Sequence, residues 1–136
     1  MAIKAVVFDV FGTLVHIARP TRPFRRLVGL LSEAGRQRQR DDGIRAMSSA
    51  LDLRQAASFF DGMISEEAIC ALEADLDDEI RSITLFADTS PTLTSLKDRG
   101  IKVALCSDLA APYGPPVLKL LPIAPDFCAW SYDAKA

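Results

Sequence analysis

The feature that most constrains the fold of this 136-residue chain is a short apolar run near its start. Six of the seven residues from Ala2 to Phe8 are apolar, and three of these are β-branched. Such a short, unbroken run predicts a strand buried on both faces, as in a parallel sheet covered by helices. Asp9 follows at once, where open α/β sheets bind their ligands. A second interpretation is that Asp9 caps the following turn, and spacing alone does not decide between the two.

Two later segments also have the pattern of buried strands. Residues 101–106 form an apolar run that ends at Ser107 and Asp108, and residues 127–131 form another. A helix between two such strands predicts a right-handed crossover that returns the chain beside the first strand. Asp9 and Ser107 would then lie side by side at one edge of the sheet. The simpler interpretation of the serine and the following aspartate is a strand-to-helix cap.

Apolar residues at helical spacing predict a series of helices between these strands. Residues 15–23 are punctuated by prolines and predict a loop. The expected helices cover residues 24–34, ended by Gly35 or Gly43; residues 44–51; residues 53–60, stopped by Asp61-Gly62; residues 66–83, capped by Ser65; residues 91–99, capped by Ser90 and ended by Gly100; and residues 117–121. The region from 16 to 83 is therefore expected to be all helical.

Composition excludes several classes of function. The net charge is −2, so the chain as a whole does not attract nucleic acid. No run is long enough to span a membrane, and Lys4 leads into the first strand rather than into a signal-peptide core. Cys70, Cys106 and Cys128 are scattered without metal-ligand spacing, which predicts buried, reduced thiols. We expect a globular, cytoplasmic protein with neither a nucleic-acid nor a membrane partner.

Charge is distributed unevenly along the expected helical region. Arginines are concentrated before residue 50, and aspartates and glutamates between residues 51 and 88. The simpler interpretation is that these are solvated helix faces that attract each other. The alternative is that Arg19, Arg22 or Arg25 meets an anionic substrate, because guanidinium groups bind carboxylates and phosphates well.

The first strand and its turn resemble a known family. Phe8–Val15 (FDVFGTLV) resembles the first motif of the haloacid dehalogenase-like hydrolase superfamily, an apolar strand followed by D-x-[D/Y/F]-G-T-L. The resemblance implies that Asp9 is the nucleophile. The strand ending in Ser107 is similar to the second motif, which implies that this hydroxyl binds the anionic oxygen of the substrate. Asp108 departs from the usual Asn, and a carboxylate there would repel an anion unless it turns away.

The resemblance also implies an architecture. We expect an α/β fold, with a Rossmann-like parallel sheet of only three strands in residues 1–15 and 84–136, and an inserted helical cap in residues 16–83. The chain looks truncated before the third motif, for which Lys135 is the only candidate lysine, and nothing present can serve as the acidic fourth motif. It is interpreted either as part of a longer hydrolase or as a shortened protein without catalysis. We expect the isolated chain to be poorly stable, to self-associate or to form a homodimer.

The residue two positions after Asp9 bears on the reaction that the resemblance implies. Phosphatases of the family place a second Asp there to protonate the departing alkoxide. Phe11 cannot donate a proton, and halide leaves without one, so Phe11 favours 2-haloacid dehalogenase-type hydrolysis, which needs no cofactor. The alternatives are a phosphatase-type hydrolase, in which Asp9 would also bind Mg²⁺, and a non-catalytic protein that binds an anion or a partner. The expected contacts with a small anionic substrate come from Phe11, Gly12, Thr13, Asp108 and Arg22.

Overall fold

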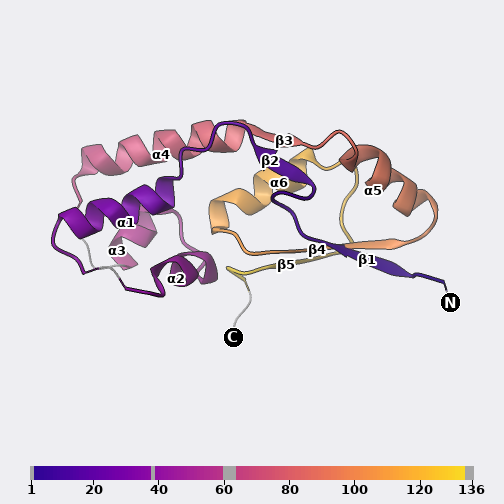
Figure 1. Ribbon diagram of the computed structural model, residues 1–136, viewed down its shortest axis with the longest axis horizontal. Helices are drawn as coiled ribbons and strands as arrows, with labels where there is room; N and C mark the ends of the chain where they lie inside the picture. The colour runs from indigo at the N-terminus through magenta and orange to yellow at the C-terminus, as the bar shows by residue number, and fades with distance from the viewer. Residues whose placement is uncertain (1, 38, 60–63, 134–136) are drawn as a thin grey trace.

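The computed structural model describes residues 2–37, 39–59 and 64–133 and divides them between two adjoining parts (Figure 1). One part is a core built on a parallel sheet. The other is a block of helices, α1–α4, which we call the helical block. A short two-stranded ribbon joins the two parts.

Three parallel strands form the sheet of the core. They are β1 (Ala5–Phe8), β4 (Lys102–Ser107) and β5 (Phe127–Trp130), in the order β1-β4-β5. Val6 of β1 lies opposite Val103 of β4, and Leu105 of β4 lies opposite Cys128 of β5. The carboxyl ends of all three strands point toward the helical block (Figure 1). The expected α/β fold with a parallel sheet is therefore confirmed.

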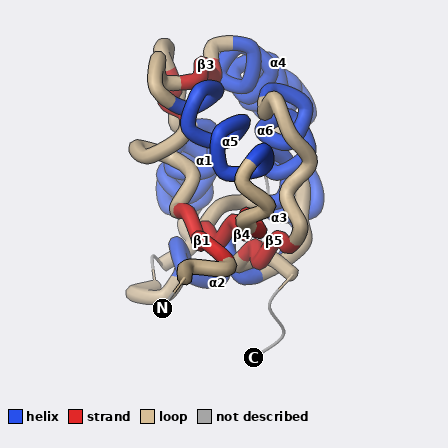
Figure 2. The backbone as a smooth tube through the Cα atoms, turned by 90° about the vertical axis from the view of Figure 1, so that its right-hand side faces the viewer, coloured by secondary structure: helices blue, strands red, loops and turns tan. Residues whose placement is uncertain are grey.

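Two helices cover one face of this sheet. They are α5 (Thr89–Asp98) and α6 (Gly114–Leu120), which lie on the same side of the strands (Figure 2). Leu93 of α5 and Val117 of α6 are fully buried and share one core cluster with Val103 and Leu105. This packing removes a large apolar area from water and stabilises the core.

The opposite face of the sheet is exposed. Ile3, Val7 and Phe127 are respectively 70%, 66% and 65% exposed. The prediction that the first strand is buried on both faces is therefore wrong. Its apolar run has enough hydrophobic residues for two covered faces, but α5 and α6 cover the same one.

The helical block contains α1 (Pro23–Glu33), α2 (Asp42–Ser48), α3 (Leu53–Phe59) and α4 (Glu66–Arg81). Ser65 caps α4 as predicted, because its side chain accepts a 3.1 Å hydrogen bond from the Ala68 N–H. The helices pack through leucines that are at most 2% exposed, namely Leu27, Leu31, Leu53 and Leu72. In the described residues, no helix has the length and apolarity needed to cross a membrane.

Oppositely charged residues pair across the helical block, as one of the two interpretations predicted. Arg26 of α1 forms an ion pair with Asp75 of α4. Arg54 of α3, which is outside the arginine-rich segment before residue 50, binds Glu66 at 2.6 Å and Glu73 at 2.8 Å, both on α4. These are exposed pairs, so each contributes little to the free energy of folding.

The ribbon between the core and the helical block was not predicted. Strand β2 (Val15–Ile17) pairs antiparallel with β3 (Ile83–Leu85). The expected loop at residues 15–23 is therefore wrong for its first three residues, and Ile83 lies in a strand rather than on the helical stripe. Strands of three residues are too short to show a clear alternation of apolar and polar residues. Here the pairing of β2 with β3 determines the conformation of both segments.

The start of α5 differs from the prediction. The helix begins at Thr89 with Asp88 at the N-cap, so Ser90 is not the cap. Thr89 Oγ1 instead donates a 2.6 Å hydrogen bond to the Leu14 carbonyl, which ties the helix to the ribbon. The predicted end of the helix is confirmed, since Gly100 follows it with a φ of +71°.

Other helix ends also differ. Helix α6 begins at Gly114, earlier than expected, because Pro115 and Pro116 fit in a first turn that needs no N–H donor. A 3-10 turn, Ala111–Tyr113, precedes it. Helix α2 ends at Ser48, before the last three residues expected in it. The expected end of α3 at residues 60–62 lies outside the described residues, as does Lys135.

The prediction that the cysteines are buried is wrong. Cys70 and Cys106 are exposed, and Cys128 is half-buried; all three are free thiols. Cys70 lies on the outer side of α4, and Cys106 shares its sheet face with exposed Val7. Burial was inferred from the usual behaviour of cysteine, whereas the outer side of α4 exposes Cys70 and the uncovered sheet face exposes Cys106.

Candidate active site

Asp9 comes directly after β1 and is exposed at the sheet edge that faces the helical block. Thr13 Oγ1 donates a 3.3 Å hydrogen bond to Asp9 Oδ2. The chain turns sharply here because Gly12 has a φ of +83°, a conformation that glycine adopts without steric cost. The Leu14 N–H donates a 2.8 Å hydrogen bond to the Val10 carbonyl and closes the turn. The turn thus places a hydroxyl beside an accessible carboxylate.

Ser107 is the last residue of β4, and Asp108 follows it. Strands β1 and β4 are parallel neighbours, paired up to Phe8 and Leu105, so Asp9 and Ser107 lie where adjacent strands end. Ser107 is only 7% exposed, and none of the described residues forms a hydrogen bond with its hydroxyl. The Ser107 hydroxyl is therefore a candidate hydrogen-bond donor at this edge of the sheet.

A cavity of about 290 Å³ lies between the helical block and the core, and we call it the cleft cavity. Of the residues selected from the sequence, Phe11, Arg22, Arg25 and Asp108 line it. The remaining selected residues are outside the lining but lie within two residues of Phe11 or Asp108 in the chain; they are Asp9, Gly12, Thr13 and Ser107. Arg19 does not reach the cavity; its backbone N–H donates a 3.0 Å hydrogen bond to Ser82 Oγ.

Three aromatic rings form one wall of the cleft cavity. Phe11 and Tyr113 meet edge to face, with ring centroids 6.0 Å apart and an interplanar angle of 85°. Phe24 of α1 lies 6.3 Å from Tyr113. This geometry is a favourable one for aromatic pairs. The packing gives Phe11 a structural role that does not depend on the leaving group.

The sequence placed Glu79 in the acidic segment that was interpreted as a solvated helix face, and for this residue the interpretation is wrong. Glu79 is 3% exposed, and its carboxylate accepts hydrogen bonds from several groups. The Tyr113 hydroxyl donates to Oε1 at 2.5 Å, and the backbone N–H groups of Thr21 and Arg22 donate to Oε2 at 2.5 and 2.6 Å. The Thr21 hydroxyl adds a fourth contact at 3.1 Å. A buried carboxylate is stable here because donors surround it.

These contacts fix the conformation of the entrance to α1. Arg22 has φ 53° and ψ 54°, a left-handed conformation that is costly for a residue with a side chain. The conformation directs its N–H toward Glu79. Burial, and then the hydrogen bond to Glu79, raises the pKa of Tyr113 well above its usual value, so the hydroxyl remains a donor.

Ser131 was also missed, and it forms a second link between the two parts. Its hydroxyl donates a 2.7 Å hydrogen bond to the Met47 carbonyl of α2 and accepts one of 2.9 Å from the Leu109 N–H. No pattern in the sequence indicates a role for Ser131.

For Glu79, the sequence does contain a signal of burial. Glu79 is the one carboxylate on the apolar stripe of α4, three residues after Leu76.

The described residues do not form a complete metal site. No group of three or more Asp, Glu, His or Cys side chains in these ranges could hold a metal ion. The Asp9 carboxylate could supply one oxygen ligand of the kind that magnesium prefers. One carboxylate is too few for a magnesium site, so no step of the chemistry below is assigned to a metal.

Comparison with known proteins places this geometry in a family. Among curated proteins, none matches the sequence. A predicted phosphoglycolate phosphatase from Haemophilus somnus has a similar structure, with a TM-score of 0.52 and 14% identity over 98% of this chain and 65% of that one. A HAD family enzyme from Bacteroides thetaiotaomicron gives a TM-score of 0.58 and 17% identity over 98% of this chain and 70% of that one. The chain thus spans about two thirds of these proteins, and at such identities the likeness shows the fold alone.

The sequence itself gives the stronger evidence. The family model for haloacid dehalogenase-like hydrolases matches residues 3–135, almost the whole chain. The matched region includes both the Asp9 turn and the end of β4. The chain belongs to the haloacid dehalogenase-like hydrolase family.

Proposed function

We propose that this chain carries the nucleophile of a phosphatase-type hydrolase that acts on a small phosphate ester. The observation that supports this most directly is the placement of Asp9 and Ser107 at the ends of neighbouring parallel strands. Phe11 and Asp108, which follow them within two residues, line a cavity together with Arg22 and Arg25. A carboxylate, a hydroxyl and two guanidinium groups are suited to attack a phosphoryl centre and to hold its anionic oxygens. Among the described residues, neither arginine forms an ion pair.

The chemistry has two steps. In the first, an Asp9 carboxylate oxygen attacks phosphorus, a P–O bond forms, and the bond to the leaving group breaks as that group departs with its electron pair. In the second, water attacks the phosphorus of the aspartyl phosphate, which releases inorganic phosphate and restores the carboxylate. The Ser107 hydroxyl would donate a hydrogen bond to a phosphoryl oxygen, and the arginines would balance its charge.

The sequence favours halogenated acids as substrates because of Phe11. Two observations favour phosphate esters instead. Phe11 packs against Tyr113, so its presence is explained without a halide leaving group. The similar B. thetaiotaomicron enzyme has also been solved with magnesium and inorganic phosphate, with 16% identity and a TM-score of 0.56 over 97% of this chain and 70% of that one. The dehalogenase remains the second candidate, because Phe11 supplies no proton to an alkoxide.

The two candidates predict different fates of water oxygen. In H₂¹⁸O, hydrolysis of an aspartyl phosphate at phosphorus puts the label in inorganic phosphate and leaves Asp9 unlabelled. Hydrolysis of an aspartyl ester at its carbonyl carbon puts the label in the Asp9 side chain. We expect labelled phosphate from p-nitrophenyl phosphate and no halide from 2-chloropropionate. Label in Asp9 together with halide release would instead establish the dehalogenase.

Variants test the nucleophile itself. We expect Asp9→Asn to reduce turnover of p-nitrophenyl phosphate to background, while Asp98→Asn, an exposed carboxylate on α5, leaves it unchanged. Activity that survives in Asp9→Asn, with mass spectrometry showing no deamidation, would contradict the assignment. A wild-type chain that binds inorganic phosphate without turning over either substrate would favour a non-catalytic anion-binding protein.

A further inference from the structure

A second cavity, of about 430 Å³, lies in the helical block, and we call it the cap cavity. It shares lining residues Phe24, Arg25, Met47 and Ala110 with the cleft cavity. The two cavities therefore adjoin each other across this common wall. The volume of the cap cavity falls within the range of about 300–1,000 Å³ that is typical of small-molecule sites.

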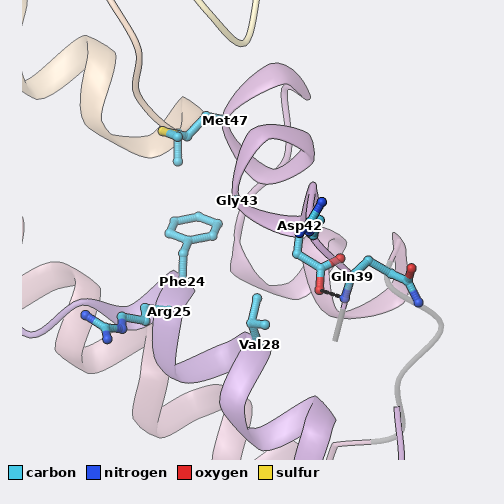
Figure 3. A pocket seen from close by; sticks show the side chains of 9 residues that line it. Phe24, Arg25, Val28, Gln39, Asp42, Gly43 and Met47 are labelled. Carbon is cyan, nitrogen blue, oxygen red and sulfur yellow. Dashed lines mark hydrogen bonds between the residues drawn. The ribbon is translucent and has the colours of Figure 1, made fainter. Parts of the chain in front are cut away.

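The walls of the cap cavity are mainly apolar. Phe24 and Val28 project from α1, and Met47 of α2 points toward the Phe24 ring (Figure 3). Gly43 of α2 also lines the cavity, and a Cβ at this position would meet no atom within 4 Å, so there is room for a larger side chain here. Aromatic, branched and thioether side chains around an open volume provide good contacts for an apolar ring.

The charges around the cap cavity favour an anion. Asp42 also lines it, but Arg36 neutralises this carboxylate through hydrogen bonds of 2.7 and 2.8 Å. Arg25 and Arg40 line the cavity as well, and among the described residues neither forms an ion pair. Figure 3 shows the Arg25 side chain running away from Val28, Gly43 and Asp42, so Arg40 is the lining arginine that remains available to bind a carboxylate or a phosphate.

We propose that the cap cavity binds the apolar body of an organic anion, whose charged group Arg40 holds. This inference rests on the proposed function and adds a substrate class to it. The substrate is a phosphate ester whose phosphoryl group lies at the sheet edge beside Asp9. Its leaving group carries an apolar ring or branched chain in the cap cavity, and a second anionic group at its far end. Arg25 lines both cavities.

Binding is measured with 2-naphthoate, an apolar bicyclic carboxylate, and the signal is the ¹³C-methyl resonance of Met47. The chain has three methionines, so Met47→Leu identifies the resonance. We expect 2-naphthoate to shift it saturably, because an aromatic ring bound in the cavity would lie close to this methyl group. The neutral analogue 2-naphthylmethanol should bind about fivefold more weakly, as should 2-naphthoate to Arg40→Gln.

Matched variants separate the cavity from non-specific binding. Gly43→Leu fills the cavity and should abolish the titration, whereas Gly29→Leu, the same change on α1 outside the lining, should not. Arg99→Gln, an exposed arginine after α5, is the charge control and should also leave the titration unchanged. A Met47 resonance that does not move, or equal effects of the two glycine variants, would overturn the proposal.

Asp9→Asn distinguishes this inference from the proposed function. We expect it to abolish hydrolysis of p-nitrophenyl phosphate and to leave the 2-naphthoate titration unchanged. If hydrolysis persists while the titration keeps its dependence on Gly43 and Arg40, the proposed nucleophile is wrong and the cavity still binds an organic anion. If hydrolysis is lost and the titration shows no such dependence, the cavity proposal alone is wrong.

Discussion

The Tyr113 hydroxyl donates a 2.5 Å hydrogen bond to Glu79 Oε1, which joins the segment after β4 to the last turn of α4. A second link, from Ser131 to the Met47 carbonyl, joins the end of β5 to α2. Both links lie beside the cleft cavity, because Tyr113, Glu79 and Met47 are among its lining residues. These two polar contacts, together with the β2–β3 ribbon, hold the helical block against the core beside the cavity.

We expect the Tyr113–Glu79 contact to contribute measurably to stability. Tyr113→Phe should lower the free energy of unfolding by about 1–2 kcal/mol, and Glu79→Gln by about 2–3 kcal/mol because its amide cannot accept from every donor. In urea denaturation the double variant should lose less than the sum of the two, with a coupling of about 1 kcal/mol. Tyr132→Phe is the control. Strictly additive losses would mean that the two side chains do not interact in solution.

The left-handed conformation of Arg22 predicts an unusual effect of glycine. Arg22→Gly should leave the free energy of unfolding unchanged or raise it by up to about 1 kcal/mol, because glycine adopts this conformation without strain. Arg25→Gly, three residues later in α1, should lower it by about 1 kcal/mol through the loss of helix propensity. Equal destabilisation by the two variants in urea denaturation would argue against the strained conformation.

The Asp42 carboxylate should make stability depend on pH in a defined window. Hydrogen bonds from Arg36 lower its pKa from 3.8 to about 2 in the folded protein. A lowered folded-state pKa stabilises the protein fully above pH 3.8, and the stabilisation is lost as the pH falls toward 2. Asp42→Asn should therefore lower the free energy of unfolding by about 2 kcal/mol at pH 7. Below pH 4 its free energy of unfolding should differ less from that of the wild type.

Urea denaturation between pH 2 and 7 checks this, with Asp41→Asn as the control. Asp41 precedes α2, is exposed, and makes no capping hydrogen bond. Its variant should follow the wild-type pH dependence. The free energies of unfolding of Asp42→Asn and wild type could instead differ by the same amount down to pH 2. That result would show that the Arg36–Asp42 ion pair does not cause the difference.

The parts of the fold that the sequence predicts are those that local patterns determine. The run before Asp9 and the run before Ser107 predict two strands, and a helix between them predicts their parallel pairing. The Ser65 cap follows from the same kind of local signal. The contacts of Glu79 and Ser131 could not be predicted, because each joins segments that are distant in sequence. The exposed sheet face was missed since the pattern shows that a strand is apolar and not what covers it.

The exposed sheet face predicts self-association of the isolated chain. Val7 and Phe127 are large, apolar and about two-thirds exposed, and β1 has an unpaired edge among the described residues. Sedimentation velocity should show an average mass that increases with concentration, and Val7→Lys should reduce that increase. Ile44→Lys is the matched control, because Ile44 is also 66% exposed but lies on α2. A monomer at all concentrations would contradict this prediction.

Phe11 should make phosphatase activity depend strongly on the leaving group. The p-nitrophenolate anion departs without a proton, whereas the alkoxide from 2-glycerol phosphate needs one that Phe11 cannot give. We expect a large ratio of kcat/KM between these two substrates, and Phe11→Asp should reduce the ratio by about tenfold or more. Phe11→Leu controls for the lost ring contact with Tyr113; it should lower stability by about 1 kcal/mol and leave the ratio unchanged. Equal kcat/KM values for both substrates in the wild type would indicate that another residue protonates the leaving group. Asp108 would be the first to test, since it lines the same cavity.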